Sequence, residues 1–184
     1  MSPPRLEIHG YAILSDDDRI AGPDGRTPPA LRNEADWDTF QRELDRADLV
    51  AIGRLGHEAY PNAKRRRRLV LSRSSRGLER RGEEYWWNPE STSWSAASAT
   101  LLPGGGRVAV PGGQAAFDLF LAIGYDAFHL TRAHGVTLSG GRAAFAACDR
   151  GFSAQAVLAR AGLRPGAPET IDAAADVTLT VWRR

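Results

Sequence analysis

The sequence predicts an α/β protein, a three-layer sandwich in which a central, mostly parallel mixed sheet has helices on both faces. Three observations support this class. Short apolar runs alternate with helical stretches along the chain, as strand–helix–strand units require. Several runs are apolar at every residue, which is typical of parallel strands buried on both faces. Residues 177–182 instead alternate between apolar and polar, which predicts an antiparallel C-terminal strand.

The first elements are a strand, a long loop and a helix. Leu6–Leu14 predicts the strand, which ends at three consecutive aspartates, and the prolines and glycines of residues 22–29 predict the loop. Asn33 is suited to cap the helix, because its side chain can accept a hydrogen bond from the first turn. We expect this helix to run to about residue 47, with one apolar stripe made of Trp37, Phe40 and Leu44.

Short apolar runs predict the inner strands at residues 49–52, 69–71, 108–110 and 127–131. Helices are expected from Gln114 to about residue 122 and from a cap at Ser153 to residue 162, with a weaker helix within residues 91–100. Ligands of such sheets bind beyond the carboxyl ends of parallel strands. We therefore look for a site where three of these strands end, at Gly53, Ser72 and Gly112-Gly113.

Length and composition narrow the class of protein. With 184 residues, 20.0 kDa and 42% hydrophobic residues, the chain is expected to form one domain, 1–184, with its own core. A single cysteine, Cys148, excludes an intramolecular disulfide and a multi-cysteine zinc site. Because no apolar run approaches the ~18 residues of a membrane span and the opening lacks a signal segment, we expect a cytoplasmic protein without a membrane partner.

The distribution of charge matters more than its sum. Lysine and arginine number 24 against 22 aspartate and glutamate, a net charge of +2 that does not by itself demand nucleic acid. Residues 64–68 form an unbroken basic run, which is typical of a solvated loop or, alternatively, of an anion-binding rim. The aromatic residues that follow, Tyr85, Trp86, Trp87 and Trp94, predict core or self-association contacts. Base stacking is the alternative, and it would indicate a nucleic-acid-binding module.

The strand ends carry residues suited to phosphate. Without side chains, Gly112 and Gly113 let the backbone approach a ligand in front of a helix, although a tight turn accounts for the pair equally well. Arg54 follows Gly53, and Arg73 follows Ser72. Two guanidiniums and a hydroxyl at neighbouring strand ends are typical of a phosphate-monoester site.

The order of these motifs resembles the dihydrofolate reductase-like superfamily, which includes dihydrofolate reductase and the reductase (C-terminal) domain of riboflavin biosynthesis. The resemblance extends over about residues 6–145. It rests on the segments Ala12–Ala21, Asp36–Phe40, Ala51–Arg54 with Glu58, Arg68–Arg73, Val108–Gly113 with Phe117, and Leu130-Thr131. Two positions depart from the pattern: Gly56 stands where these families usually have threonine, and Pro28-Pro29-Ala30 lacks the tryptophan that follows proline in the folate enzymes.

The resemblance implies an oxidoreductase that binds NADPH. Arg54, Ser72 and Arg73 would hold the 2′-phosphate, and Ala12 and Ile20 would flank the nicotinamide. The pyrophosphate would meet backbone at Gly53, Leu55, Gly56, Gly112, Gly113 and Gln114.

The resemblance also implies a catalytic pair and a substrate pocket. Asp36 would be the carboxyl group that helps to protonate a substrate ring or anchors it, and Thr131 would orient Asp36. Trp37 and Phe40 would line the pocket, and Arg66 would take the place of the arginine that binds the folate tail. From the residues alone, Asp36 reads equally well as a charge in the first turn of a helix.

We therefore expect a reductase that transfers hydride to a small nitrogen heterocycle, of the pterin, dihydrofolate or pyrimidine type, with no metal. The alternative is a non-catalytic protein of the same fold that binds a nucleotide or nucleic acid. Riboflavin-type relatives imply a homodimer, which an exposed Trp86 or Trp87 could serve.

Overall fold

The computed structural model describes residues 5–184 and contains a ten-stranded mixed sheet. Residues 1–4, part of the opening for which we expect no signal segment, lie outside the described residues. The strands of this sheet are β1 (Leu6–Leu14), β3 (Leu49–Gly53), β4 (Arg68–Leu71), β5 (Leu78–Arg81), β6 (Glu84–Trp87), β7 (Gly106–Val110), β8 (Ala127–Ala133), β10 (Arg164–Pro165), β11 (Glu169–Asp172) and β12 (Val177–Arg183).

The strands lie in the order β10-β12-β8-β1-β7-β3-β4-β6-β5, and β11 also pairs with β12. The six neighbours from β8 to β6 are parallel, whereas β12 runs antiparallel to β8 and β5 antiparallel to β6. This arrangement confirms the predicted mostly parallel mixed sheet and its antiparallel C-terminal strand. A second, two-stranded sheet joins β2 (Arg19–Ala21) to β9 (Arg142–Ala143).

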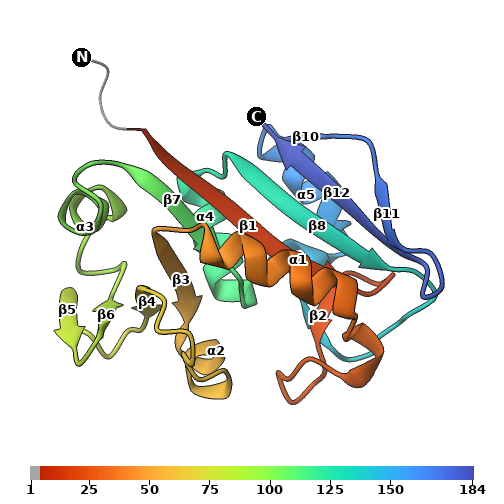
Figure 1. Ribbon diagram of the computed structural model, residues 1–184, viewed down its shortest axis with the longest axis horizontal. Coiled ribbons are helices and arrows are strands. Elements are labelled where there is room, and N and C mark those ends of the chain that lie inside the picture. The colour runs from red at the N-terminus through yellow and green to blue at the C-terminus, as the bar shows by residue number, and fades with distance from the viewer. Residues whose placement is uncertain (1–4) are drawn as a thin grey trace.

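Helices cover both faces of the sheet. Figure 1 shows α1 in front of β1, with α4 and α5 behind the sheet. The helical elements are α1 (Glu34–Asp45), α2 (Arg54–Ala59), α3 (Trp94–Leu101), α4 (Gln114–Ile123), α5 (Ala154–Arg160) and two short 3-10 turns, η1 (Pro29–Leu31) and η2 (Ala146–Arg150). No helix within residues 5–184 has both the length and the apolar character needed to cross a membrane.

Alternating residues of the inner strands supply two cores. On the face of α3, α4 and α5, Val108 and Val110 pack with Phe117 and Phe128 in the larger cluster. On the opposite face, Ala109 packs with Tyr11, Leu44 and Val50, and Phe40 of α1 lies against them. The sheet is therefore buried on both sides, as its uniformly apolar strands predict.

The local signals place most elements correctly. Asn33 caps α1 by accepting a hydrogen bond from the backbone N–H of Asp36 at 3.0 Å, and Ser153 caps α5 in the same way through Ala156. The stretch of residues 91–100 forms α3, which Ser93 caps. The three residues of the apolar stripe predicted for α1 differ in burial: Leu44 is buried, Phe40 is half-buried and Trp37 is exposed.

Trp87 makes the core contact expected for one of the aromatic residues after the basic run. Trp87 is 1% exposed and packs with Trp94 and Phe120, so neither a dimer contact nor base stacking can use its ring. Trp86 is half-buried, and the guanidinium of Arg81 lies 4.7 Å from its ring centre. Trp87 is therefore part of the core, whereas Trp86 stays partly exposed beside an arginine.

The basic run of residues 64–68 is not uniformly solvated. Arg68 is buried in β4, where its Nη1 donates to the carbonyl of Tyr60 at 2.8 Å. Arg67 donates to the carbonyl of Leu101 at 2.7 Å. The last arginines of the run therefore tie the end of α2 and the end of α3 to the sheet.

Gly10 marks the tightest packing of β1. A Cβ at this residue would lie 2.3 Å from Cδ2 of Phe128. We expect Gly10→Ala to lower the free energy of unfolding by about 1–3 kcal/mol, because overfilling a packed core forces side chains and backbone to move. Urea denaturation measures this change. Gly104→Ala is the matched control, since a Cβ there meets nothing within 4 Å. A Gly10 variant as stable as the wild type would contradict this packing.

Candidate active site

The rim of the candidate site is formed by three adjacent parallel strands, β7, β3 and β4. Gly112, Gly53 and Ser72 follow or end these strands, so the parallel arrangement brings them to the same edge of the sheet. The backbone N–H of Gly53 donates to the carbonyl of Gly112 at 3.3 Å. A Cβ at Gly53 would lie 3.9 Å from the backbone nitrogen of Gly113, which shows how closely the two turns approach.

The paired glycines leave space in front of α4. Gly112 has a φ of 108°, and a Cβ there would lie 3.0 Å from the ring of Phe117, so only glycine suits this residue. A Cβ at Gly113 would meet nothing within 4 Å. Gly113 caps the ten-residue helix α4 without a side-chain hydrogen bond. The first turn of α4 has no side-chain cap, so its N–H groups can donate hydrogen bonds to an anion at this end of the helix.

The predicted phosphate residues lie along the same rim. Arg54 begins α2 and pairs with Glu58 at 2.7 Å, while Arg73 pairs with Glu90 at 3.2 Å. All four of these side chains are exposed, so the ion pairs contribute little to stability and can exchange for another anion. The hydroxyl of Ser72 lies 2.8 Å from that of Ser74 in the turn after β4.

Local packing explains why glycine, and not the threonine usual in the related families, stands at residue 56. A Cβ at this residue of α2 would lie 3.1 Å from Cγ1 of Ile52 on β3, tighter than most such contacts. Glycine therefore lets α2 sit close to the sheet. The neighbouring Leu55 points outward and is 56% exposed.

Two half-buried residues, Ala12 of β1 and Ile20 of β2, pack against the larger core beside the loop after β1. Asp18 and Arg132 anchor that loop through a 2.8 Å ion pair. Gln114, at the start of α4, donates from its side chain to Asp149 at 3.1 Å. The side chain of Gln114 is therefore hydrogen-bonded within the protein, to η2. Its backbone N–H lies in the first turn of α4, where the pyrophosphate contact was predicted.

Asp36 lies in the first turn of α1 and faces the sheet. Burial raises the pKa of its carboxyl group, because the charged form is disfavoured away from water, and a hydrogen bond with the side chain of Thr131 on β8 opposes part of the rise. Asn33 fixes the start of this helix by donating to Asp172 of β11 at 2.8 Å. The predicted catalytic pair is therefore brought together by two segments far apart in the sequence.

Exposed apolar side chains occur on α1 and on the α2 segment. Trp37, Leu55 and Tyr60 are the large apolar side chains that stay exposed among the described residues, at 53%, 56% and 45%. Trp37 packs on Phe40, with ring centres 5.9 Å apart.

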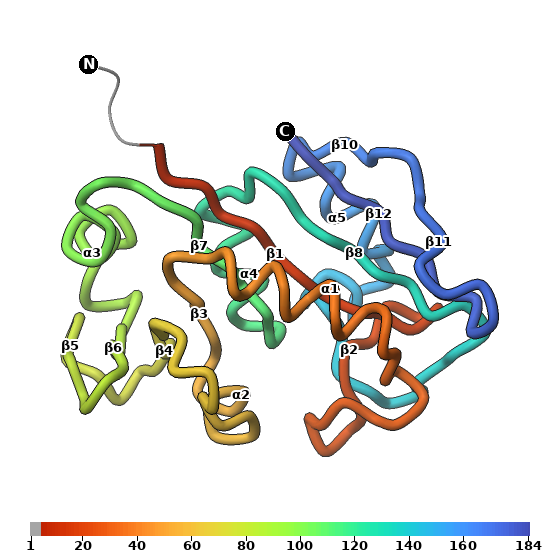
Figure 2. Tube along the Cα trace, in the orientation of Figure 1, coloured from red at the N-terminus to blue at the C-terminus, as the bar shows by residue number. Residues whose placement is uncertain are grey.

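The loop between β2 and α1 extends toward α2 (Figure 2). The hydroxyls of Thr27 and Tyr60 lie 3.1 Å apart and join the two segments. Sequence analysis did not single out Tyr60, because one tyrosine after a six-residue helix carries no periodic signal.

Arg66 lies beside α1, in the segment between α2 and β4, but its guanidinium already has protein partners. Its Nε donates to Asp45 at 2.9 Å, and its Nη2 donates to Asp45 at 2.6 Å and to the side chain of Gln41 at 2.7 Å. The sequence did not predict that Asp45 and Gln41 of α1 bind Arg66, because hydrogen bonds between distant segments produce no local sequence pattern.

A cluster of polar side chains lies deeper under α1. Tyr11 donates to Glu43 at 3.2 Å, and its ring stacks on His129, with ring centres 4.5 Å apart. Burial, together with the neighbouring His9, lowers the pKa of His129 to about 4. His129 is therefore neutral near pH 7.

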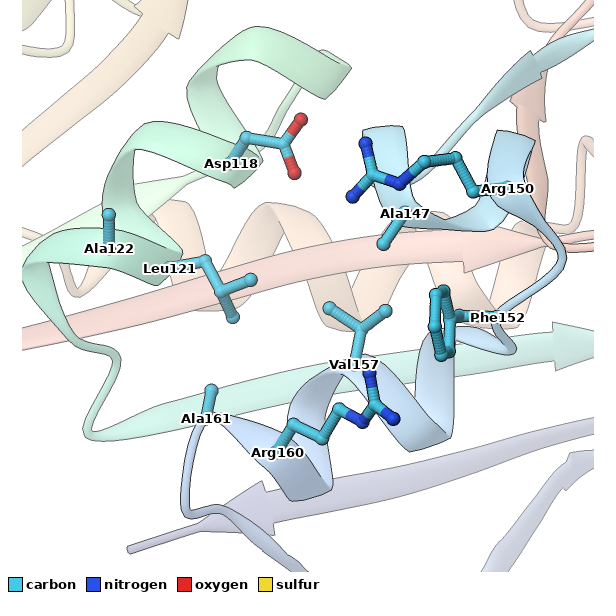
Figure 3. Close-up of a pocket in the computed structure, with 9 residues that line it drawn as sticks. All are labelled: Asp118, Leu121, Ala122, Ala147, Arg150, Phe152, Val157, Arg160 and Ala161. Carbon is cyan, nitrogen blue, oxygen red and sulfur yellow. The ribbon is translucent and has the colours of Figure 1, made fainter.

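A separate pocket of about 370 Å³ lies on the opposite face of the sheet, between α4, η2 and α5 (Figure 3). Asp118 and Arg150 extend toward each other at one end, and the guanidinium of Arg160 lies 4.3 Å from the ring centre of Phe152. None of the predicted site residues lines this pocket. Within residues 5–184, no group of three histidine, cysteine, aspartate or glutamate side chains could hold a metal ion.

Comparison with solved structures identifies the fold. A riboflavin biosynthesis protein from Shewanella sp. PV-4 superposes with a TM-score of 0.67 at 17% identity, covering 97% of this chain and 99% of that one. Dihydrofolate reductase from Enterococcus faecalis, solved with NADP(H), gives a TM-score of 0.66 at 16% identity, covering 97% and 96%. The chain has the dihydrofolate reductase-like fold.

A third structure with the dihydrofolate reductase-like fold is bifunctional. It is the diaminohydroxyphosphoribosylaminopyrimidine deaminase/5-amino-6-(5-phosphoribosylamino)uracil reductase from Thermotoga maritima, with a TM-score of 0.66 at 15% identity. The match covers 97% of the present chain but 56% of the Thermotoga chain. No family model and no curated protein matches the present sequence.

The raised pKa of Asp36 predicts a pH-dependent cost to stability. A carboxyl group whose pKa is raised by folding stabilises the fold at low pH, and this contribution is lost as the pH rises through the raised value. We expect Asp36→Asn to be more stable than the wild type at about pH 8, with a smaller difference at about pH 4.

Thermal unfolding at both pH values measures this difference. Asp38→Asn, an exposed residue on the same helix, is the matched control and should show no such change. An equal effect of Asp36→Asn at the two pH values would show that Asp36 is not buried as described.

Proposed function

We propose that the protein is an NADPH-dependent reductase that transfers hydride to a small nitrogen heterocycle of the pterin, dihydrofolate or pyrimidine type. The observation that carries this proposal is the half-buried Asp36, which is hydrogen-bonded to Thr131 and directly precedes the exposed Trp37 on α1. Glycine turns and exposed arginines border the same face of the molecule. The dihydrofolate reductase-like fold supports the proposal through neighbours that are named as reductases.

The rim fits a dinucleotide phosphate. In this proposal Arg54, Arg73 and Ser72 hold the 2′-phosphate, because exposed guanidiniums can exchange their weak surface partners for a doubly charged group. The pyrophosphate meets the open first turn of α4 at Gly113 and Gln114, together with backbone at Gly53, Leu55, Gly56 and Gly112. Ala12 and Ile20 border the place for the nicotinamide.

Asp36 supplies the proton in the proposed reaction. Because its pKa is raised, a larger share of the carboxyl group is protonated near neutral pH than for an exposed aspartate. It can then donate to a ring nitrogen of the substrate, and as a carboxylate it can accept hydrogen bonds from a ring N–H and an adjacent amino group. Thr131 orients it, and Trp37 and Phe40 pack against the ring. The cofactor, when bound, supplies the hydride.

The two arginines predict a preference for NADPH over NADH. We expect Arg54→Ala and Arg73→Ala each to weaken NADPH binding by roughly tenfold or more, since a hydrogen bond to a charged group contributes about 1.5–3 kcal/mol. NADH affinity should barely change. Titration against intrinsic fluorescence measures both, because the chain contains five tryptophans.

Arg160→Ala is the control for charge, since Arg160 lies in the pocket on the opposite face of the sheet. Equal binding of NADPH and NADH by the wild type would refute the proposed phosphate site, and no saturable binding of either would refute the reductase.

The proton-donor role predicts a separation of turnover from cofactor binding. We expect Asp36→Asn to lower kcat by roughly 100-fold, as is typical when a general acid is lost, while NADPH affinity stays unchanged. In the wild type the rate should fall as the pH rises through the raised pKa of Asp36, because the protonated form is lost.

The measurement is NADPH oxidation with dihydrofolate, pterins and an aminopyrimidinone ribose phosphate as substrates. Asp118→Asn is the matched control: burial also raises the pKa of the Asp118 carboxyl, but Asp118 lines the pocket on the opposite face. Unaltered turnover in the Asp36 variant would remove this residue from the mechanism.

A further inference from the structure

We propose that the pocket behind the sheet is a second ligand site, which binds a small apolar monocarboxylate with its carboxylate on Arg160. The pocket has a volume of about 370 Å³ and lies between α4, η2 and α5 (Figure 3). None of the residues assigned to the candidate active site lines it, so this inference does not depend on the proposed function.

Two helices provide most of the pocket wall. From each helix the lining residues recur at i, i+3 and i+4, so they share one side of that helix. They are Asp118, Leu121 and Ala122 of α4, and Val157, Arg160 and Ala161 at the end of α5. Six of the nine lining residues are apolar and three of these are alanine, whose small side chain leaves room between the helices. A mostly apolar lining with a few charged groups is typical of a site for a small molecule.

Hydrogen bonds hold the walls of the pocket in place. The two carboxylate oxygens of Asp118 lie 3.3 and 3.1 Å from the backbone nitrogen of Ala146, whose N–H joins η2 to α4. The backbone N–H of Ala154, the first residue of α5, donates to the buried Asp18 at 3.0 Å. The pocket is therefore formed before a ligand arrives, and binding does not have to order it.

The charged residues of the pocket leave one cation without a counter-charge. Asp118 and Arg150 extend toward each other at one end, so their charges offset each other (Figure 3). Arg160 lies at the other end, and within residues 5–184 no carboxylate forms an ion pair with it. The lining therefore has one net positive charge, which is complementary to a single negative charge on a ligand.

The side chain of Arg160 is held in a position to bind a carboxylate. Its guanidinium carbon lies 4.3 Å from the ring centre of Phe152. Stacking on a ring uses the flat face of a guanidinium, and its N–H groups stay available at the edge, where they match a carboxylate. Leu121 and Val157 lie between Arg160 and Asp118 (Figure 3).

This arrangement selects an anion with an apolar body. A carboxylate on Arg160 would place its attached chain over Leu121 and Val157, and would itself stay away from the negative charge of Asp118. The chain would remove apolar surface of the pocket from water, which an inorganic anion or a short carboxylate cannot do. A medium-length fatty acid has both properties.

Three matched ligands test the proposal. Octanoate has the chain and the charge, octanamide has the same chain without the charge, and acetate has the charge without the chain. Affinities are measured by isothermal titration calorimetry, and the place of binding is read from the shifts of backbone amide NMR signals. The variants are Arg160→Gln, Leu121→Ala and, as the matched control, Arg164→Gln, since Arg164 is exposed just after α5 but does not line the pocket.

We expect saturable binding of octanoate with a Kd of about 1 mM or below, roughly tenfold tighter than octanamide, because of the charge-assisted bond to Arg160. Acetate should not bind measurably. Arg160→Gln should weaken octanoate to the level of octanamide, and Leu121→Ala should weaken both ligands by a similar factor. Arg164→Gln should change neither. The amide shifts should be confined to the end of α4, η2 and α5.

Several results would overturn the inference: equal affinity for octanoate and octanamide, no saturable binding of octanoate, wild-type affinity in Arg160→Gln, or amide shifts located at α1. Shifts at the pocket that depend on protein concentration without any ligand would also overturn it, because a second copy of the chain would then cover this surface. Each of these outcomes is independent of whether the protein binds NADPH.

Discussion

The parallel pairing of β7, β3 and β4 is the constraint on which the candidate site depends. Leu49 is aligned with Val108, and Gly53 with Leu71, so the turns after the three strands lie side by side. Because these strands are short and buried on both faces, sliding one along its neighbour would move apolar residues out of the core at one end and draw the polar residues of the flanking turns into it at the other. The burial of these apolar strands, which stabilises the sheet, therefore also positions the glycine turns and the arginines at one rim.

The same constraint explains how Asp36 and Thr131, the proposed catalytic pair, come together. α1 connects β1 to β3 across the front of the sheet, and Asn33 fixes its first turn to β11. Thr131 arrives on β8, the parallel neighbour of β1. A buried carboxyl group lowers the stability of the fold at neutral pH. A protein retains such an unfavourable group where the surrounding packing fixes its position. Asp36 meets that condition, since the helix cap and the sheet determine its position.

Local sequence patterns were sufficient to predict the inner strands and the capped helices. They were insufficient to predict the edge strands and the packing partners of individual side chains. β3, β7 and β8 are apolar throughout, whereas Leu78–Arg81 carries three charged residues and forms the edge strand β5 without an apolar signal. Trp87 is buried because Trp94 of α3 and Phe120 of α4 pack on its ring, and both residues lie outside its own segment. Long-range contacts of this kind have no counterpart in periodicity.

The same limit applied to the candidate site. The strand-end residues could be predicted because parallel strands place their ends together, and the pairing of Asp36 with Thr131 was available only through the family resemblance. Tyr60, Gln41 and Asp45 were missed, since their relevance depends on the approach of the α2–β4 segment to α1.

The arginines show why residue type alone does not define a binding site. Arg54 and Arg73 are exposed and paired across the surface, where solvent weakens the attraction, so an incoming phosphate meets little competition. Arg66 is mostly buried and makes several bonds to α1, and Arg68 is buried against a carbonyl at the end of α2. Removing the partner of a buried arginine is costly, because its charge is then left without compensation. The first pair is therefore available to a ligand, while the second pair holds the α2–β4 segment against α1 and the end of α2.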